Sequence, residues 1–208
     1  LTIKQAHSIE NVISKSRFIA YIKPVSTENE AKAFIDEIKT KHKDATHNCS
    51  AYTVGPEMNI QKANDDGEPS GTAGIPMLEI LKKQEIHNVC VVVTRYFGGI
   101  KLGAGGLIRA YSGAVRDVIY DMGRVELREA IPVTVTLDYD QTGKFEYELA
   151  STTFLLREQF YTDKVSYQID VVKNEYDAFI DFLNRITSGN YDLKQEDLKL
   201  LPFDIETN

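Results

Sequence analysis

A glycine-rich segment is the strongest sign of chemistry in the chain. The stretch GGIKLGAGG at residues 98–106 holds five of the thirteen glycines, namely Gly98, Gly99, Gly103, Gly105 and Gly106. It lies between a strand-like and a helix-like segment, where glycines let backbone N–H groups approach a phosphate or a carboxylate. With Lys101 and Arg109 nearby, the glycines predict an anion-binding or nucleic-acid-binding site. Glycines that serve only turns and close packing of a helix on a sheet are the alternative.

Two nucleotide-binding patterns are not met in this segment. The dinucleotide pattern G-x-G-x-x-G fails because its third glycine position holds Ile108. The Walker pattern fails because Ala104 stands where a lysine is required. The segment therefore predicts a general anion site, and we expect no cofactor.

A polar loop at residues 64–74 (NDDGEPSGTAG) is the second candidate site. Together with the preceding histidine, it predicts a polar ligand site made of His47, Asp66, Glu68, Ser70 and Thr72. Its acids could bind a divalent cation through oxygen ligands, but the spacing does not match the calcium-loop pattern, so we expect no metal. A turn-rich surface loop that begins a helix is the alternative.

No pair of nucleophile and base stands at a recognised spacing. His47 and Cys49 share one face of a predicted strand, but the sequence contains neither G-x-S-x-G nor H-E-x-x-H. Cys49 also fits a small core residue. Catalysis is therefore not the first expectation.

Charge is distributed unevenly along the chain. The net charge is −7, with a net of +2 (16 basic, 14 acidic) over residues 1–124 and −9 (8 basic, 17 acidic) over residues 125–208. Residues 86–116 contain no acid but contain Arg95, Lys101, Arg109 and Arg116. A polyanion such as RNA would therefore meet this segment, whereas the acidic second half would meet a basic protein.

Composition indicates a folded protein without membrane spans. Hydrophobic residues make up 42% of the chain and charged residues 26%, as in globular proteins. The longest apolar stretch, residues 89–93, is far shorter than the roughly 20 residues of a membrane helix. Two cysteines are too few for a disulfide scaffold. We expect a cytoplasmic protein with no membrane contact.

Hydrophobic periodicity predicts an α+β chain of two domains, 1–124 and 125–208. In the first we expect strands at 12–21, 47–54 and 88–96, helices at 26–42, 75–84 and 107–122, and a polar loop at 55–71. In the second we expect strands at 131–139, 159–162, 164–172 and 191–201, and helices at 142–158 and 175–188. This order, β-α-β-β-α-β, is the ferredoxin-like pattern.

The motifs of the first half resemble those of the YigZ/IMPACT family. The matching stretches are SRF at 16–18, ATH at 45–47, AY at 51–52, DGEPSGTAG at 66–74, VTRYFGGIKLG at 93–103 and LIRAY at 107–111. The resemblance covers residues 11–119, and the second half is similar in pattern to the bacterial branch of the family, which adds a ferredoxin-like domain.

The resemblance implies a fold and a field of activity. The first domain should resemble the second domain of a small-subunit ribosomal protein. In eukaryotes, family members act in translational control by restraining an amino-acid-starvation kinase. That interaction uses an additional N-terminal domain, so we do not expect kinase regulation from this chain. The expectation is a translation-associated regulatory or accessory protein that binds RNA or a ribonucleoprotein, such as the ribosome, through the first domain. An enzyme that acts on a small phosphorylated substrate at the two loops is the alternative.

Overall fold

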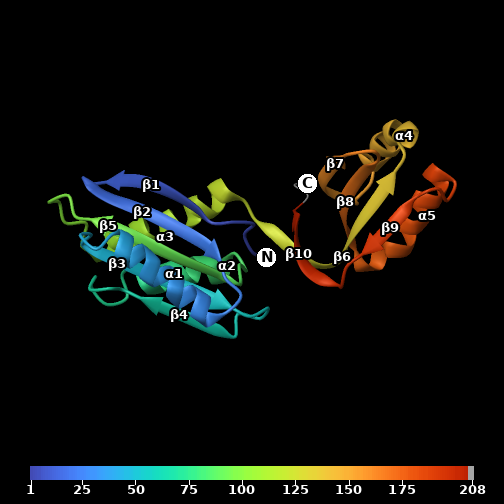
Figure 1. Cartoon of the computed structure of the whole chain (residues 1–208). Helices are drawn as coiled ribbons and strands as arrows, with labels where there is room; N and C mark the ends of the chain where they lie inside the picture. The colour runs from blue at the N-terminus through green and yellow to red at the C-terminus, as the bar shows by residue number, and fades with distance from the viewer. Residues whose placement is uncertain (206–208) are drawn as a thin grey trace. The chain divides into compact units, whose positions relative to one another are not determined.

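The computed structural model describes residues 1–205, which form two compact units (Figure 1). Unit 1 comprises Leu1–Glu126 together with Asp204 and Ile205, and unit 2 comprises Leu127–Phe203. Each unit has its own hydrophobic core. Within the described residues, no helix is both long and apolar enough to cross a membrane.

Unit 1 is built on a five-stranded antiparallel sheet. Its strands are β1 (His7–Ile13), β2 (Ser16–Pro24), β3 (His47–Val54), β4 (Ile60–Asn64) and β5 (Val89–Tyr96), in the order β1-β2-β5-β3-β4. The central strand, β5, is buried along nearly its whole length. A strand buried on both faces needs apolar residues at every position, as the sequence VCVVV supplies.

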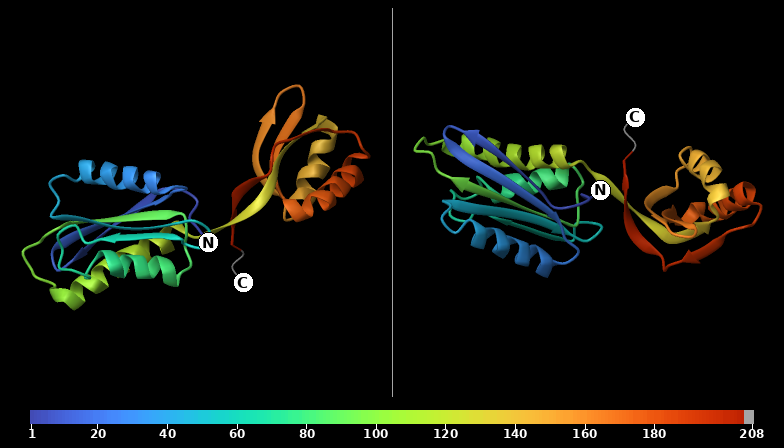
Figure 2. Two further views of the ribbon diagram at one scale, coloured as in Figure 1. Left: turned by 90° about the horizontal axis from the view of Figure 1, so that it is seen from below. Right: turned by 45° about the horizontal axis from the view of Figure 1, so that its top comes forward.

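Helices cover both faces of this sheet (Figure 2). On one face, α1 (Glu28–Lys41) packs on Cys90 and Val92. On the other, α2 (Gly74–Lys83) and α3 (Gly103–Met122) pack on Val91 and Val93. Because successive side chains of a strand point to opposite faces, one apolar run serves both layers.

Unit 2 has the predicted ferredoxin-like order. After β6 (Val125–Leu137) come α4 (Tyr139–Leu149), β7 (Leu155–Tyr161), β8 (Val165–Val172), a 3₁₀ turn (Lys173–Glu175), α5 (Tyr176–Thr187), β9 (Asp192–Gln195) and β10 (Lys199–Asp204). The sheet order is β10-β6-β8-β7, and β9 also pairs with β6. The inward side chains of β6 and β8 pack with Phe145 of α4 and Phe179 of α5 to form the core.

Two element predictions in unit 1 are corrected by the turns and the sheet. The predicted strand at 12–21 is a hairpin, because Ser14 and Lys15 adopt positive φ angles of 47° and 64° and turn the chain between β1 and β2. The predicted loop at 55–71 contains β4, which pairs with β3. The turn at Ser14 and Lys15 carries no glycine or proline, whereas Gly55 and Pro56 mark the turn that precedes β4.

The other corrections concern the ends of elements. The long helix begins at Gly103 and not at residue 107, so Gly103, Gly105 and Gly106 belong to its first turn. In unit 2 the predicted helix at 142–158 ends at Leu149, and β7 begins at Leu155. The predicted strand at 191–201 divides into β9 and β10.

Candidate functional site

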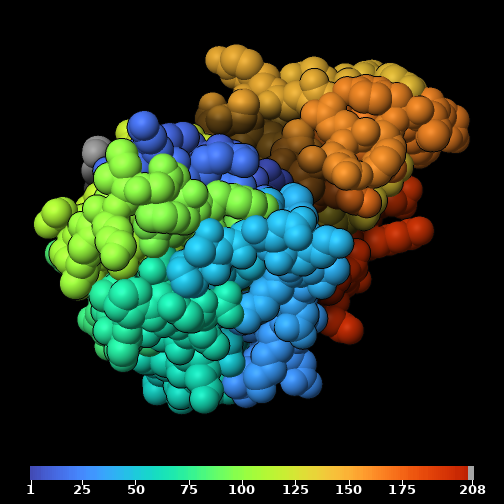
Figure 3. All heavy atoms as spheres, turned by 90° about the vertical axis from the view of Figure 1, so that its left-hand side faces the viewer, coloured from blue at the N-terminus to red at the C-terminus, as the bar shows by residue number. Residues whose placement is uncertain are grey.

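A pocket of about 360 Å³ opens at the end of unit 1 where β5 leads into α3. Three segments that are distant in sequence line it, and their residues are Thr46, His47, Glu68, Pro69, Arg95, Phe97, Lys101, Leu102, Gly103, Ala104 and Leu107. Figure 3 shows this end of unit 1 from outside, with the segment after β5 adjoining the loop at 64–74. The two candidate loops of the sequence therefore meet in one pocket.

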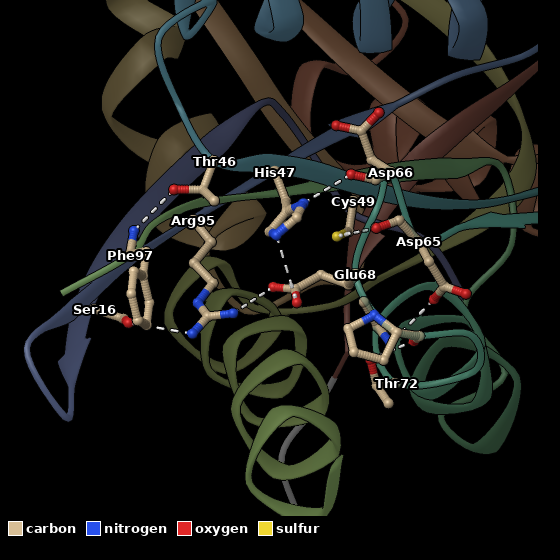
Figure 4. A network of polar contacts seen from close by, with 12 residues as sticks. Ser16, Thr46, His47, Cys49, Asp65, Asp66, Glu68, Thr72, Arg95 and Phe97 are labelled. Atoms are coloured by element: carbon tan, nitrogen blue, oxygen red, sulfur yellow. Dashed lines mark hydrogen bonds and ion pairs between the residues drawn. The ribbon is translucent and has the colours of Figure 1, made fainter. Parts of the chain in front are cut away.

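Glu68 is the buried acceptor at the centre of the site. Nη1 of Arg95 donates to its Oε1 over 2.7 Å, and the hydroxyl of Tyr111 donates to the same oxygen over 2.7 Å (Figure 4). The exposed fractions of the Glu68 and Arg95 side chains are 2% and 6%. Burial raises the pKa of Tyr111 far above its usual value, and the contacts with Cys49 and Glu68 raise it further, so this hydroxyl stays a neutral donor.

His47 is held in one orientation by the backbone of the polar loop. Its Nδ1 lies 2.9 Å from the carbonyl oxygen of Asp66, and because a carbonyl can only accept, Nδ1 carries a proton. The other ring nitrogen, Nε2, lies 3.6 Å from Oε2 of Glu68. The loop approaches the ring closely at Gly67, whose φ of +87° favours glycine. The imidazole is thus presented to the pocket with Nε2 forward.

Asp65 holds the backbone of the polar loop. The carboxylate of Asp65 accepts hydrogen bonds from the N–H groups of Gly71, Ala73 and Gly74. Burial raises the pKa of Asp65, but these three bonds outweigh it, so its pKa is lowered overall. Asp65 therefore ties the loop to the start of α2 as a carboxylate.

The other predicted loop residues, Asp66, Ser70 and Thr72, lie outside the pocket lining. Asp66 accepts from the N–H of Asn48 over 2.7 Å and from Lys39 over 2.8 Å. Ser70 is exposed, and the buried hydroxyl of Thr72 donates to the carbonyl of Pro69. Across residues 1–205, no three His, Cys, Asp or Glu side chains converge in a way that could hold a metal.

Arg95, which the sequence predicts in an anion-binding or nucleic-acid-binding site, is a buried, ion-paired cation. Besides its bond to Glu68, its Nη2 reaches Oγ of Ser16 over 3.4 Å, and the guanidinium lies 5.5 Å from the ring centroids of Phe18 and Phe97. Its Nε has no hydrogen-bond partner within the part of the chain that the structure describes. The ion pair with Glu68 explains how a strand-end arginine can be buried.

The glycine segment divides into a turn and a helix start. The turn packs against the β1–β2 hairpin at Gly98, where a Cβ would lie 2.0 Å from the carbonyl of Lys15. The helix begins at Gly103 without a side-chain cap, so the first N–H groups of α3 keep their hydrogen-bonding capacity. Lys101 and Arg109 are exposed, and Arg109 reaches back along α3 toward Gly105.

The predicted site residues therefore fall into two groups. Those that line the pocket are His47, Glu68, Arg95, Lys101 and Gly103, and those outside its lining are Asp66, Ser70, Thr72, Gly98, Gly99, Gly105, Gly106 and Arg109. Residues that sequence reasoning did not place in the site include Ser16, Thr46 and Tyr111. Ser16 and Thr46 each lie in a short family motif, which was the available signal.

Comparison with known proteins places both units in described families. Residues 14–119 match the Impact N-terminal domain, and residues 135–190 match a domain of unknown function, DUF1949. The IMPACT family member YvyE of Bacillus subtilis is 50% identical over 96% of this chain and 92% of its own length. The IMPACT family member YigZ of Escherichia coli is 38% identical over 64% of this chain and 67% of its own length.

A solved structure is similar along the length of this chain. The crystal structure of a hypothetical protein, 29% identical, matches 100% of this chain and 97% of that chain with a TM-score of 0.57. The match to the Impact N-terminal domain covers every residue of the pocket described above. On the strength of these matches, the chain belongs to the IMPACT family.

Proposed function

We propose that this protein is a translation-associated accessory protein that contacts RNA or a ribonucleoprotein through the pocket end of unit 1. Membership of the IMPACT family supports the link to translation, because members of this family act in translational control. Fold likeness alone carries little weight for function, so the proposal depends on the chemistry of this surface.

The observation that carries the proposal is an exposed aromatic ring that shares a pocket with an exposed lysine. Phe97 is 47% exposed and lines the pocket. Lys101 is exposed and lines the same pocket, the backbone of Lys15 lies against Gly98, Arg109 is exposed on α3, and residues 86–116 contain no acid. Single-stranded RNA is bound by aromatic faces that stack on bases together with cations that contact phosphates.

Salt dependence tests the electrostatic part of the proposal. Three cations that contact phosphates of a single strand predict a slope of log K against log salt concentration of about −2. The measurement is fluorescence polarisation of a labelled single-stranded RNA 12-mer with the full chain between 50 and 200 mM salt, on the order of the range in which such contacts weaken. Absence of binding at the lowest salt, or binding that salt does not weaken, would refute the proposal.

A pair of variants locates the contact on the molecule. Replacing Lys101 and Arg109 with alanine should reduce the slope by about 1.4 while the melting temperature stays nearly unchanged. The matched control replaces Lys82 and Lys83, two exposed lysines at the other end of α2, and removes the same charge. Equal weakening by both pairs would show that only net charge matters.

The pocket also supports a second candidate, an enzyme acting on a small phosphorylated substrate. The observation in its favour is that both polar loops line one pocket, where Nε2 of His47 faces Glu68. Burial raises the pKa of Cys49 to about 12, and its Sγ donates to the carbonyl of Asp65, so this thiol is no nucleophile at neutral pH. Release of inorganic phosphate from phosphomonoesters that is lost in His47→Gln would favour the enzyme.

A further inference from the structure

We infer that the pocket binds a phosphomonoester group, supplied either by the 5′ end of an RNA or by a free mononucleotide. This inference rests on the proposed function, because it concerns the RNA contact of the same end of unit 1. Cations and a stacking ring bind single-stranded RNA whatever its ends carry. A phosphomonoester site would in addition recognise one particular chemical group.

The first observation is the unsatisfied donor of Arg95. Its side chain is only 6% exposed, yet Nε has no partner among the described residues. Buried donors in folded proteins nearly always have a partner. In Figure 4 the Nε edge of the guanidinium lies on the side of Ser16 and Phe97 and away from Glu68. The Nε atom is covered in this structure, so a ligand oxygen that completes this arginine enters where the half-exposed Phe97 ring, whose centroid lies 5.5 Å from the guanidinium, moves aside.

The second observation is the uncapped start of α3 on the same pocket. The helix is 20 residues long, and no side chain caps its N-terminus. Gly103 and Ala104, in its first turn, line the pocket. The free N–H groups and the positive end of the helix dipole both favour an anion there. Lys101, exposed beside this helix start, adds a full positive charge.

The charge of Glu68 does not oppose an anion in this arrangement. Its Oε1 already accepts from Arg95 and Tyr111, so the carboxylate is compensated within the pocket wall. The donors that remain come from β5, from the loop before α3 and from α3 itself. Donors that approach from separate elements suit the three oxygens of a tetrahedral phosphate better than a planar carboxylate.

The remaining walls suit the nucleoside part of such a ligand. Phe97, Pro69 and Leu107 supply apolar surface beside the donors. A volume of about 360 Å³ falls at the lower end of the range for small-molecule sites. The pocket thus combines an anion-binding end with a wall on which a base can stack.

The test compares two RNAs that differ only at the 5′ end. Binding of a 12-mer with a 5′-phosphate and of the same 12-mer with a 5′-hydroxyl, both labelled at the 3′ end, is measured with the full chain. We expect the phosphorylated RNA to bind about tenfold more tightly, which corresponds to about 1.4 kcal/mol. Competition by uridine 5′-monophosphate, with uridine and inorganic phosphate as comparisons, separates the two sources of the group.

Ala104→Glu is the variant that closes the pocket without harming the fold. A carboxylate in the first turn of a helix is favourable to the helix, so the melting temperature should not fall. The same carboxylate occupies the anion-binding end, so the tenfold preference should disappear. The control is Asn29→Glu, which places the same charge in the first turn of α1 on the other face of the sheet. It should keep the preference.

The outcomes separate this inference from the proposed function. Equal binding of both RNAs overturns the phosphate site and leaves the RNA contact standing. A preference that survives Ala104→Glu overturns the assignment to this pocket. Binding of uridine 5′-monophosphate that Ala104→Glu abolishes, with no binding of either RNA, supports the phosphate site and refutes the proposed function.

Discussion

Replacing Glu68 with glutamine should destabilise unit 1 strongly. Glutamine keeps an acceptor for the hydroxyl of Tyr111 and for Nη1 of Arg95, and it has nearly the same size. What it removes is the charge that faces a guanidinium whose side chain is 6% exposed. The substitution therefore leaves a buried cation without its counter-ion, which is the costly way to break such a pair.

The expected size of the effect follows from burial and from the size of the unit. Removing one partner of a buried ion pair costs about 3–5 kcal/mol. With an unfolding entropy of about 2.1 cal/mol/K per residue, the 126 residues of Leu1–Glu126 lose about 4 °C of melting temperature for each kcal/mol. Glu68→Gln should therefore lower the melting temperature of unit 1 by about 11–19 °C.

Differential scanning calorimetry of the full chain measures this shift, and Glu10→Gln is the matched control. Glu10 accepts from Nε of Arg17 over 2.8 Å, nearly the distance between Glu68 and Arg95. The side chains of both Glu10 and Arg17 are exposed. Solvent screens such a pair, so the control should melt essentially with the wild type. If Glu68→Gln also melts with the wild type, the buried charge is not what holds the pocket.

Three further predictions concern packing and protonation. Gly98→Ala should lower the melting temperature, because its Cβ would lie 2.0 Å from backbone of the β1–β2 turn, whereas Gly143→Ala, in open space on α4, should not. Burial raises the pKa of the Cys49 and Cys90 thiols to about 12, so Ellman's reagent at pH 8 should react with them only after unfolding. The unfolding free energy should also fall between about pH 9 and 12, because thiols ionise in the unfolded chain and not in the folded one. Burial lowers the pKa of both His42 and His87, so urea denaturation should show stability lost as the pH falls below about 6.5, where the unfolded chain takes up protons first. His42→Gln should reduce this dependence, and the part that comes from His87 should remain.

Elements with a strong hydrophobic periodicity could be predicted from the sequence, whereas elements that depend on tertiary contacts could not. The helix at 28–41 and the buried strand at 89–96 carry their pattern locally. The hairpin turn at Ser14 and Lys15 uses left-handed residues without a glycine, so nothing local distinguished it from a continuous strand. The start of α3 was missed because glycine is a poor helix former, and tertiary packing overrode that preference.

The site was predictable where chemistry is local and misjudged where it depends on a distant partner. His47, Glu68 and Lys101 were selected for their residue types, and they do line the pocket. The sequence predicts Arg95 in an anion-binding site but does not show that the side chain is buried, because arginine is almost never buried alone. Its partner, Glu68, lies 27 residues away in a loop, and their pairing is a product of the fold. Tyr111 lies in the LIRAY motif at 107–111, but the sequence does not show that its hydroxyl donates to Glu68.

The acid-rich loop and the proposed anion-binding pocket are compatible, because hydrogen bonds and ion pairs within unit 1 compensate the loop's negative charge. Asp65 is bound by three backbone N–H groups, Asp66 by Lys39 and a backbone N–H, and Glu68 by Arg95. A carboxylate compensated in this way exerts little field on a ligand. Among residues 1–205, neither Lys101 nor Arg109 forms an ion pair, so these two exposed cations contribute uncompensated positive charge to unit 1. A loop rich in acids is therefore compatible with the proposed phosphate site, and its acids serve to fix its shape.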